Sequence, residues 1–217
     1  MRRRIGFMVR AFPSALLSAL LMAGAVHGAD QNAPAQDPSQ LVQSVAQGML
    51  HDLDADRAAY RKDPTKINAL VEKHLLPHFD TTYSARLVLG KHWRDATPQQ
   101  RERFVGAFYK SLLRNYGSAL AEFTGDKLKV YPSQVSPDSN TATVRTEVKR
   151  SDGTRVPVNY TLHKTPDGWK AWDVVIEGIS YVKSFREDFG AEIDQKGLDA
   201  VIDRIEKGGK PMPAGKA

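Results

Sequence analysis

The chain contains no cysteine among its 217 residues. This excludes disulfide bonds, thiolate metal sites and thiol nucleophiles, and it also excludes the lipid-modified cysteine that anchors a lipoprotein. After residue 29 the sequence has no apolar run approaching the roughly 20 residues that cross a bilayer. We therefore expect a mature chain that is free in its compartment and is stabilised by an apolar core.

The first 29 residues have the layout of a secretory signal peptide. Residues 1–10 contain four arginines and no acidic residue, residues 11–26 form an apolar stretch, and the small residues Gly28 and Ala29 end it. The stretch is short and contains Pro13, which argues against a membrane span. Cleavage after Gly28 or Ala29 fits this layout, Ala33-Pro34-Ala35 offers a later site, and an uncleaved anchor is the alternative.

Removal of this signal changes the charge balance. The whole chain has 31 basic and 25 acidic residues, a formal charge of +6, and its first 29 residues contribute four arginines and no acid. The mature chain then carries 27 basic and 25 acidic residues, a formal charge of +2. No long basic run or basic-aromatic stripe remains, so the sequence gives little support to nucleic-acid binding.

Helix signals dominate the first half of the mature chain. Asp37-Pro38 and Asp63-Pro64 each place an N-cap residue before a proline in the first helical turn. The second helix should end before Pro77, because the residue before a proline avoids the helical conformation. Thr97-Pro98-Gln99-Gln100 contains a capping box and predicts a long helix that runs to about Phe123.

From Lys127 the apolar residues alternate as they do in strands. Four such segments are separated by turn signals that include Asp152-Gly153 and Pro166-Asp167-Gly168. Their inward positions are Leu128 and Val130; Ala142, Val144, Thr146 and Val148; Val156, Val158, Tyr160 and Leu162; and Trp172, Val174 and Ile176. Helical sequence returns from about Tyr181 and breaks at Gly197 before a last helix.

Helices followed by strands and then by helices predict an α+β fold, with a four-stranded antiparallel meander wrapped by helices. A twisted sheet that is covered in this way can enclose an apolar cavity. We expect a linker over residues 30–37, one domain over residues 38–207 and a disordered tail over residues 208–217.

The candidates for a metal site are weak. His74 and His78 are four residues apart, with Glu72 and Asp80 nearby, but Pro77 disrupts the helix that would place both histidines on one face. We therefore predict that the chain has no metal site.

The candidates for catalysis are equally weak. Asp173 and Glu177 lie at the end of the fourth segment, and positions four apart on a strand are about 13 Å apart. Because this is too far for a shared acid–base pair, we expect an ion pair or hydrogen bonds at a helix end. No serine lies in a nucleophile-elbow pattern. The sequence predicts a protein that is not an enzyme.

Several segments are informative through their order and spacing. They are Leu75-Leu76-Pro77-His78-Phe79; Tyr83 with Leu87-Val88-Leu89-Gly90; Ala96-Thr97-Pro98-Gln99-Gln100-Arg101 with Phe104, Phe108, Leu112, Tyr116 and Gly117; Trp169-Lys170-Ala171-Trp172-Asp173; Glu177-Gly178-Ile179-Ser180; and Lys196-Gly197-Leu198. Together they resemble the MlaC, or toluene-tolerance, family, the phospholipid-binding component of the pathway that maintains outer-membrane lipid asymmetry. The resemblance covers roughly residues 38–207 and departs at His78 and Arg86.

The resemblance implies a periplasmic phospholipid carrier that is soluble once its signal peptide is removed. Its partners would be an outer-membrane lipoprotein complex and an inner-membrane ABC transporter with its substrate-binding component. The fold would be NTF2- or cystatin-like in outline, with a bound glycerophospholipid as cargo and no cofactor. We predict that the lipid-binding residues are Val71, Leu75, Phe79, Tyr83, Val88, Phe104, Phe108, Leu112, Tyr160, Trp172, Val174 and Ile179.

Two alternatives stay open on the sequence. An envelope interaction or assembly protein could share this pattern with a filled core. An isomerase-like enzyme could use the same cavity, and it would need a buried Asp173 or Tyr160. Lipid that copurifies with the chain would separate the carrier from both alternatives.

Overall fold

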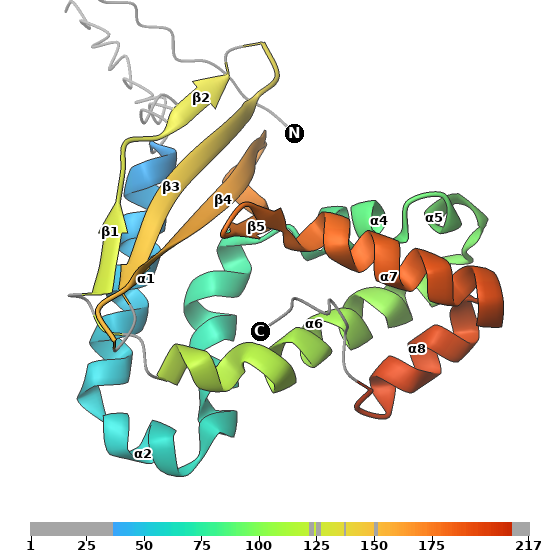
Figure 1. The fold of residues 1–217 in the computed structure, drawn as a ribbon, viewed down its shortest axis with the longest axis horizontal. Coiled ribbons are helices and arrows are strands. Elements are labelled where there is room, and N and C mark those ends of the chain that lie inside the picture. The colour runs from blue at the N-terminus through green and yellow to red at the C-terminus, as the bar shows by residue number, and fades with distance from the viewer. Residues whose placement is uncertain (1–36, 122–123, 125–126, 137, 150–151, 210–217) are drawn as a thin grey trace, which may run out of the picture. The chain divides into compact units, whose positions relative to one another are not determined.

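The computed structural model describes residues 37–121, 124, 127–136, 138–149 and 152–209. The predicted signal peptide, the linker up to residue 36 and the tail from residue 210 lie outside these described residues. Within them, a group of helices precedes an antiparallel sheet and a second group follows it (Figure 1). The predicted α+β fold is therefore confirmed.

Among the described residues, six strands form one antiparallel sheet. They are β1 (Leu128–Val130), β2 (Gln134–Ser136), β3 (Thr141–Lys149), β4 (Arg155–Thr165), β5 (Gly168–Ile176) and β6 (Ile179–Ser180). The strand order is β1-β3-β4-β5-β6. Strand β2 also pairs with β3, at the opposite end of β3 from the residues that pair with β1. Four of these strands are the four predicted segments, whereas β2 and β6 are too short for alternation to reveal.

The register places Tyr160 of β4 opposite Val144 of β3 and opposite Val174 of β5. Directly opposed residues point to the same face of a sheet. The predicted inward residues of these three strands therefore share one face along most of their length, as their alternation indicated.

A β-bulge shifts the register between β4 and β5 at Thr161 and Leu162. Beside it, the carbonyl of Ala171 accepts a hydrogen bond from the backbone N–H of Asp80, and the carbonyl of Trp172 accepts one from the hydroxyl of Ser84. Bulges commonly redirect backbone groups at the edge of a sheet. Here those groups attach the segment before and within α4 (Thr81–Leu89) to β5.

The helices before the sheet begin with α1 (Pro38–Ala55). Asp37 is its N-cap and accepts hydrogen bonds from the backbone N–H groups of Ser39 and Gln40, at 2.8 and 3.3 Å, so the predicted start is confirmed. The further elements are α2 (Arg57–Lys62), η1 (Pro64–Lys66), α3 (Ile67–Leu70), η2 (Val71–Leu75), η3 (Leu76–His78), α4, α5 (His92–Asp95) and α6 (Pro98–Ala121).

The second predicted helix is divided in the structure. Turns of 3₁₀, α, π and again 3₁₀ type follow one another from Pro64 to His78. The π turn ends at Leu75 and Pro77 lies in a separate 3₁₀ turn, so the prediction that the helix stops before Pro77 is confirmed. In a regular α-helix the ring of Pro77 would collide with the carbonyl of Lys73, four residues earlier. The wider π turn of η2 and the tighter turn of η3 give a local geometry that accommodates the proline.

The long helix begins as predicted. The backbone N–H of Thr97 donates to Oε1 of Gln100 at 2.9 Å, and the backbone N–H of Gln100 donates to the hydroxyl of Thr97 at 3.2 Å. These reciprocal bonds form the capping box. The described part of α6 has 24 residues and ends at Ala121, so the predicted end near Phe123 lies outside the described residues.

After the sheet, α7 (Tyr181–Lys196) and α8 (Leu198–Glu206) meet at Gly197, which has a φ of +82°. A positive φ favours glycine, so the predicted helix break at this residue is confirmed. Two residues of the predicted tail, Gly208 and Gly209, still donate backbone hydrogen bonds to carbonyls of α8.

Buried apolar side chains gather in three clusters. The helical cluster, between α4, α6, α7 and α8, contains Ala85, Val88, Leu89, Phe104, Ala107, Phe108, Val182, Phe185, Phe189, Ile193, Val201, Ile202 and Ile205. The sheet cluster contains Leu41, Ala142, Val144, Leu162 and Ala171. The α3 cluster contains Leu53, Ile67, Leu70 and Val71.

Candidate functional site

One face of the sheet, called here the inner face, carries Val144, Tyr160 and Val174. Helix α1 contacts β3 and β1 and places Leu41 against this face in the sheet cluster (Figure 1). Under α1 the face is filled, because Val144 is 0% exposed and Leu162 is 1% exposed. This part of the inner face is ordinary protein core.

Further along β4 and β5 the inner face is incompletely covered. Val158, Tyr160, Val174 and Ile176 lie on it and are only partly buried. Burying apolar surface is worth about 25 cal/mol per Å². A row of half-open aliphatic and aromatic side chains on the inner side of a sheet therefore offers a favourable contact surface to an apolar ligand.

Tyr160 lies at the centre of this surface. Burial raises the pKa of its phenol. The residue is nevertheless only partly buried, so part of its side chain stays open to contact with another molecule.

Further partly buried apolar residues lie on η2 and α6. Leu75, Tyr109, Leu113 and Leu120 are partly buried and pack against the α3 cluster. Because η2 contacts α1 while η3 contacts β5, the segment from η2 to η3 connects α1 to the β5 edge of the sheet.

Four buried side-chain atoms of the described residues have no hydrogen-bond partner, on His92, Tyr109, Thr124 and Trp172. Two of them are the hydroxyl of Tyr109 in α6 and the indole Nε1 of Trp172 in β5. Burial, together with the nearby Glu72, also raises the pKa of Tyr109. An unsatisfied buried polar group costs about 1–3 kcal/mol. Each of these atoms can donate to an oxygen of a bound molecule that also has apolar parts.

The model of the MlaC protein family matches residues 43–207, which include the inner face, η2, α6 and both C-terminal helices. The chain belongs to the MlaC family. The match spans most of the chain, so the family assignment applies to the domain as a whole and not to one motif.

Relatives of this MlaC-family chain include the toluene tolerance protein ttg2D of Pseudomonas putida, which is 33% identical over 166 residues, covering 75% of this chain and 77% of that protein. The intermembrane phospholipid transport system binding protein MlaC of Haemophilus influenzae is 22% identical over 170 residues, covering 77% and 79%. A phospholipid-binding protein of Ralstonia solanacearum, solved in complex with a phospholipid, has the same fold, with a TM-score of 0.74 at 24% identity over 80% of this chain and 97% of that one.

The structure distributes the twelve predicted lining residues over several surroundings. Val88, Phe104 and Phe108 lie in the helical cluster, with Leu112 and Trp172 packed at its margin. Phe79 and Tyr160 pack against the sheet cluster, and Val71 and Leu75 belong to or contact the α3 cluster. Val174 lies on the inner face, Tyr83 contacts the rings of His163 and Trp172 in tilted and edge-to-face geometry, and Ile179 is 54% exposed on β6.

The lining residues predicted from the sequence did not include four partly buried residues that we add to the candidate site: Val158, Ile176, Tyr109 and Leu113. Val158 and Ile176 share the alternation of Tyr160 and Val174, so the register alone could have added them. Tyr109 and Leu113 widen the apolar stripe of α6, but the stripe alone does not predict which neighbouring element each turn of the helix contacts.

The residues weighed for chemistry have structural partners. Nε2 of His74 lies 2.8 Å from Oδ2 of Asp52 in α1, an ion pair that joins η2 to α1. Asp173 accepts hydrogen bonds from the backbone N–H of Val182 and from the hydroxyl of Ser180 at the start of α7. The expectation that Asp173 makes hydrogen bonds at a helix end is confirmed.

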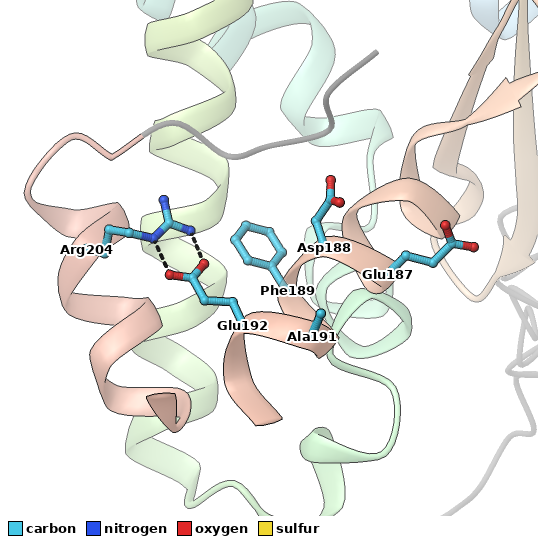
Figure 2. A pocket seen from close by; sticks show the side chains of 6 residues that line it. All are labelled: Glu187, Asp188, Phe189, Ala191, Glu192 and Arg204. Atoms are coloured by element: carbon cyan, nitrogen blue, oxygen red, sulfur yellow. Dashed lines mark hydrogen bonds and ion pairs between the residues drawn. The ribbon is translucent and has the colours of Figure 1, made fainter. Parts of the chain in front are cut away.

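Two surface pockets lie on the helices, away from the inner face. The first, of about 260 Å³, lies between α7 and α8 and is lined by Glu187, Asp188, Phe189, Ala191, Glu192 and Arg204 (Figure 2). Its Glu192 and Arg204 form a two-point ion pair at 2.9 and 2.7 Å. Its size and charged lining do not suit an acyl chain. The second pocket, of about 410 Å³, is strongly basic.

No helix within the described ranges is both long and apolar enough to span a bilayer.

Proposed function

We propose that this chain carries a glycerophospholipid, with its acyl chains held between the inner face and the wall formed by η2 and α6. The half-open apolar row around Tyr160 and Val174 is the observation that carries this proposal. The bound phospholipid of the Ralstonia relative supports it, since that protein has the same fold.

The dimensions suit acyl chains. The 24 residues of α6 span about 36 Å at 1.5 Å per residue, and the 11 residues of β4 span a similar length. Each methylene that stays shielded from water is worth about 0.8 kcal/mol, so a carrier must cover nearly the whole of each chain to compete with a membrane. Walls of this length can do so.

Within the site, Val158, Tyr160, Val174 and Ile176 form the sheet wall, and Leu75, Tyr109, Leu112 and Leu113 form the helix wall. Val88 and Phe104 are fully enclosed in the helical cluster, so they support the helix wall from behind. The unpaired donors of Tyr109 and Trp172 would meet ester or phosphate oxygens of the lipid. The chain needs no cofactor and performs no catalytic step for this task.

The same proposal extends to the cellular role. The chain would be exported to the periplasm, its signal peptide would be removed by cleavage, and it would shuttle phospholipid between an outer-membrane complex and an inner-membrane ABC transporter. The name of the Haemophilus relative, an intermembrane phospholipid transport system binding protein, supports this assignment.

Native mass spectrometry of the mature protein purified from bacteria tests the proposal. We expect a species heavier than the bare chain by the mass of one or more diacyl phospholipids, and solvent extraction should release those lipids. Protein that stays bare after purification and after incubation with phospholipid vesicles would contradict lipid carriage and favour an interaction protein.

A further inference from the structure

The second surface pocket lies between α4, α5 and α7. It is called here the basic pocket and is lined by Arg86, Leu87, Gly90, Lys91, Trp93, Arg94 and Arg186. Four of these seven residues carry a positive charge and none carries a negative one. None of them belongs to the sheet or to the proposed lipid site.

Gly90 allows Arg186 to approach the end of α4 closely. It ends α4 with a φ of +53°, which a residue with a side chain adopts only with strain. A Cβ at this position would also lie 2.8 Å from Nε of Arg186, so the guanidinium of Arg186 rests directly on the glycine backbone. The glycine thus brings Arg186 of α7 to the end of the helix that carries Arg86.

A fifth cation, Arg101 of α6, contacts two of the residues that line the pocket. Its Nε and Nη2 donate to the carbonyls of Trp93 and Arg94, at 2.9 and 3.2 Å, and its guanidinium lies 5.2 Å from the centre of the Trp93 ring. Arg101 therefore holds the last turn of α5 in place and adds positive charge beneath it.

Carboxylates do not neutralise most of this charge. Lys91 pairs with Asp194 at 2.9 Å, but Arg86, Arg94 and Arg186 have no ion pair among the described residues, and Arg86 stacks on the ring of Tyr83. Arginines of the neighbouring helices α6 and α8, by contrast, are closely paired. Arg103 lies 2.7 Å from both Asp203 and Glu206, and Arg204 lies 2.7 Å from Glu192.

We propose that the basic pocket docks an acidic segment of a partner protein, whose carboxylates pair with Arg86, Arg94 and Arg186. Arginine presents a planar fork that binds carboxylates through two hydrogen bonds. Arginine and tryptophan are also the residues that contribute most to protein–protein binding energy. A concave basic surface around a tryptophan therefore fits an extended or helical segment that bears Asp or Glu.

A membrane surface fits these observations less well. Peripheral membrane binding combines basic residues with apolar side chains that insert among the lipids. Among the described residues, the large apolar side chains that are exposed are Val135 of β2 and Ile179 of β6, and neither lines the basic pocket. The pocket is also hollowed, whereas a membrane docks on a raised or flat surface.

In-cell photo-cross-linking tests the proposal. The full chain is made in the organism that encodes it, with a photoreactive amino acid in place of Lys91, which lines the pocket and is exposed. We expect a cross-link to a protein segment rich in Asp or Glu. The yield should fall about tenfold or more in the double variant Arg94→Glu/Arg186→Glu. Reversal of the carboxylates in the cross-linked segment to arginine should restore it.

Two controls make the result specific. The double variant Lys110→Glu/Lys164→Glu changes the net charge equally at exposed positions outside the pocket and should leave the yield unchanged. The Arg94→Glu/Arg186→Glu protein should keep its bound lipid, so failure of lipid carriage and failure of docking are separable. A cross-link to lipid only, an undiminished yield in the Arg94→Glu/Arg186→Glu variant, or no cross-link at Lys91 would overturn the proposal.

Discussion

Oδ1 of Asp173 accepts a hydrogen bond of 3.0 Å from the backbone N–H of Val182, in the first turn of α7. Its Oδ2 accepts a second bond, of 2.6 Å, from the hydroxyl of Ser180, the N-cap of that helix. Asp173 is 4% exposed on β5. One buried carboxylate therefore joins the end of the sheet to the start of the helical cluster.

Asp173→Ala should lower the free energy of unfolding by about 2–3 kcal/mol, because it leaves the N–H of Val182 buried without an acceptor. Asp173→Asn keeps an acceptor and should cost less. Urea unfolding followed by circular dichroism measures both. Asp167→Ala, in the exposed β4–β5 turn, is the control and should change the free energy by less than about 0.5 kcal/mol. Equal effects at the two positions would disprove this role of Asp173.

Val174→Asp should reduce the phospholipid that copurifies with the chain about tenfold or more, since it places a charge among buried acyl methylenes. Lipid extraction followed by mass spectrometry measures the ratio of lipid to protein. Val135→Asp makes the same change on a strand where the valine is 47% exposed, and it should keep the wild-type ratio. A folded Val174→Asp protein with full lipid content would place the acyl chains elsewhere.

Phe104 and Leu113 lie on the same helix and should respond in opposite ways. Phe104→Ala should cost about 3–5 kcal/mol in lipid-free protein, because Phe104 is 0% exposed and packs on Phe108 and Phe189. Leu113→Ala removes a partly buried side chain and should cost about 1 kcal/mol. We expect only Leu113→Ala to weaken lipid retention during delipidation and reloading. If only Phe104→Ala weakened lipid retention, Phe104 would be the lining residue and Leu113 the supporting one.

Gly90→Ala should lower the free energy of unfolding by about 1–3 kcal/mol, since it forces a side chain into a positive φ and against Arg186. Gly106→Ala is the matched control, because a Cβ at Gly106 meets no atom within 4 Å and the residue lies inside α6. It should stabilise the chain by up to about 1 kcal/mol. Thermal and urea unfolding measure both, and shifts of the same sign would contradict this account of Gly90.

Hydrogen bonds from Lys73 and His74 lower the pKa of Asp52 from 3.8 to about 2. A carboxyl whose pKa is lower in the folded chain contributes stability above its unfolded pKa, and the contribution is lost as the pH falls towards the folded value. The difference in free energy of unfolding between wild type and Asp52→Asn should therefore shrink from pH 5 to pH 2. A difference that stays constant over this range would show that Asp52 makes no such contribution.

The sequence predicted the parts of the fold that depend on regular patterns. Alternation located the four main strands, and local caps located the starts of α1 and α6, because both signals act within a few residues. The divided helix around Pro77 was missed, since a π turn results from how Pro77 is accommodated between α1 and β5, which are distant in sequence. Strands β2 and β6 were also missed, because each is too short to show alternation and forms only by pairing with β3 or β5.

The candidate site was less predictable than the fold. Phe104 and Tyr160 both fall on the apolar side of their element, yet Phe104 packs on Phe108 and Phe189 and is 0% exposed, whereas Tyr160 is only partly buried. Periodicity shows which side of an element avoids water, but it does not show whether protein or ligand covers that side. The register of β4 with β5 and the packing of α6 carry this information.

The two outer strands of the sheet have a consequence for a protein that must exist both with and without cargo. An uncovered sheet edge offers unpaired backbone groups to any other strand and promotes aggregation. Here one edge ends in the three-residue strands β1 and β2 and the other in the two-residue strand β6. Edge strands this short offer few unpaired backbone groups to a strand of a second molecule. A chain that has released its lipid should therefore stay monomeric long enough to bind lipid again.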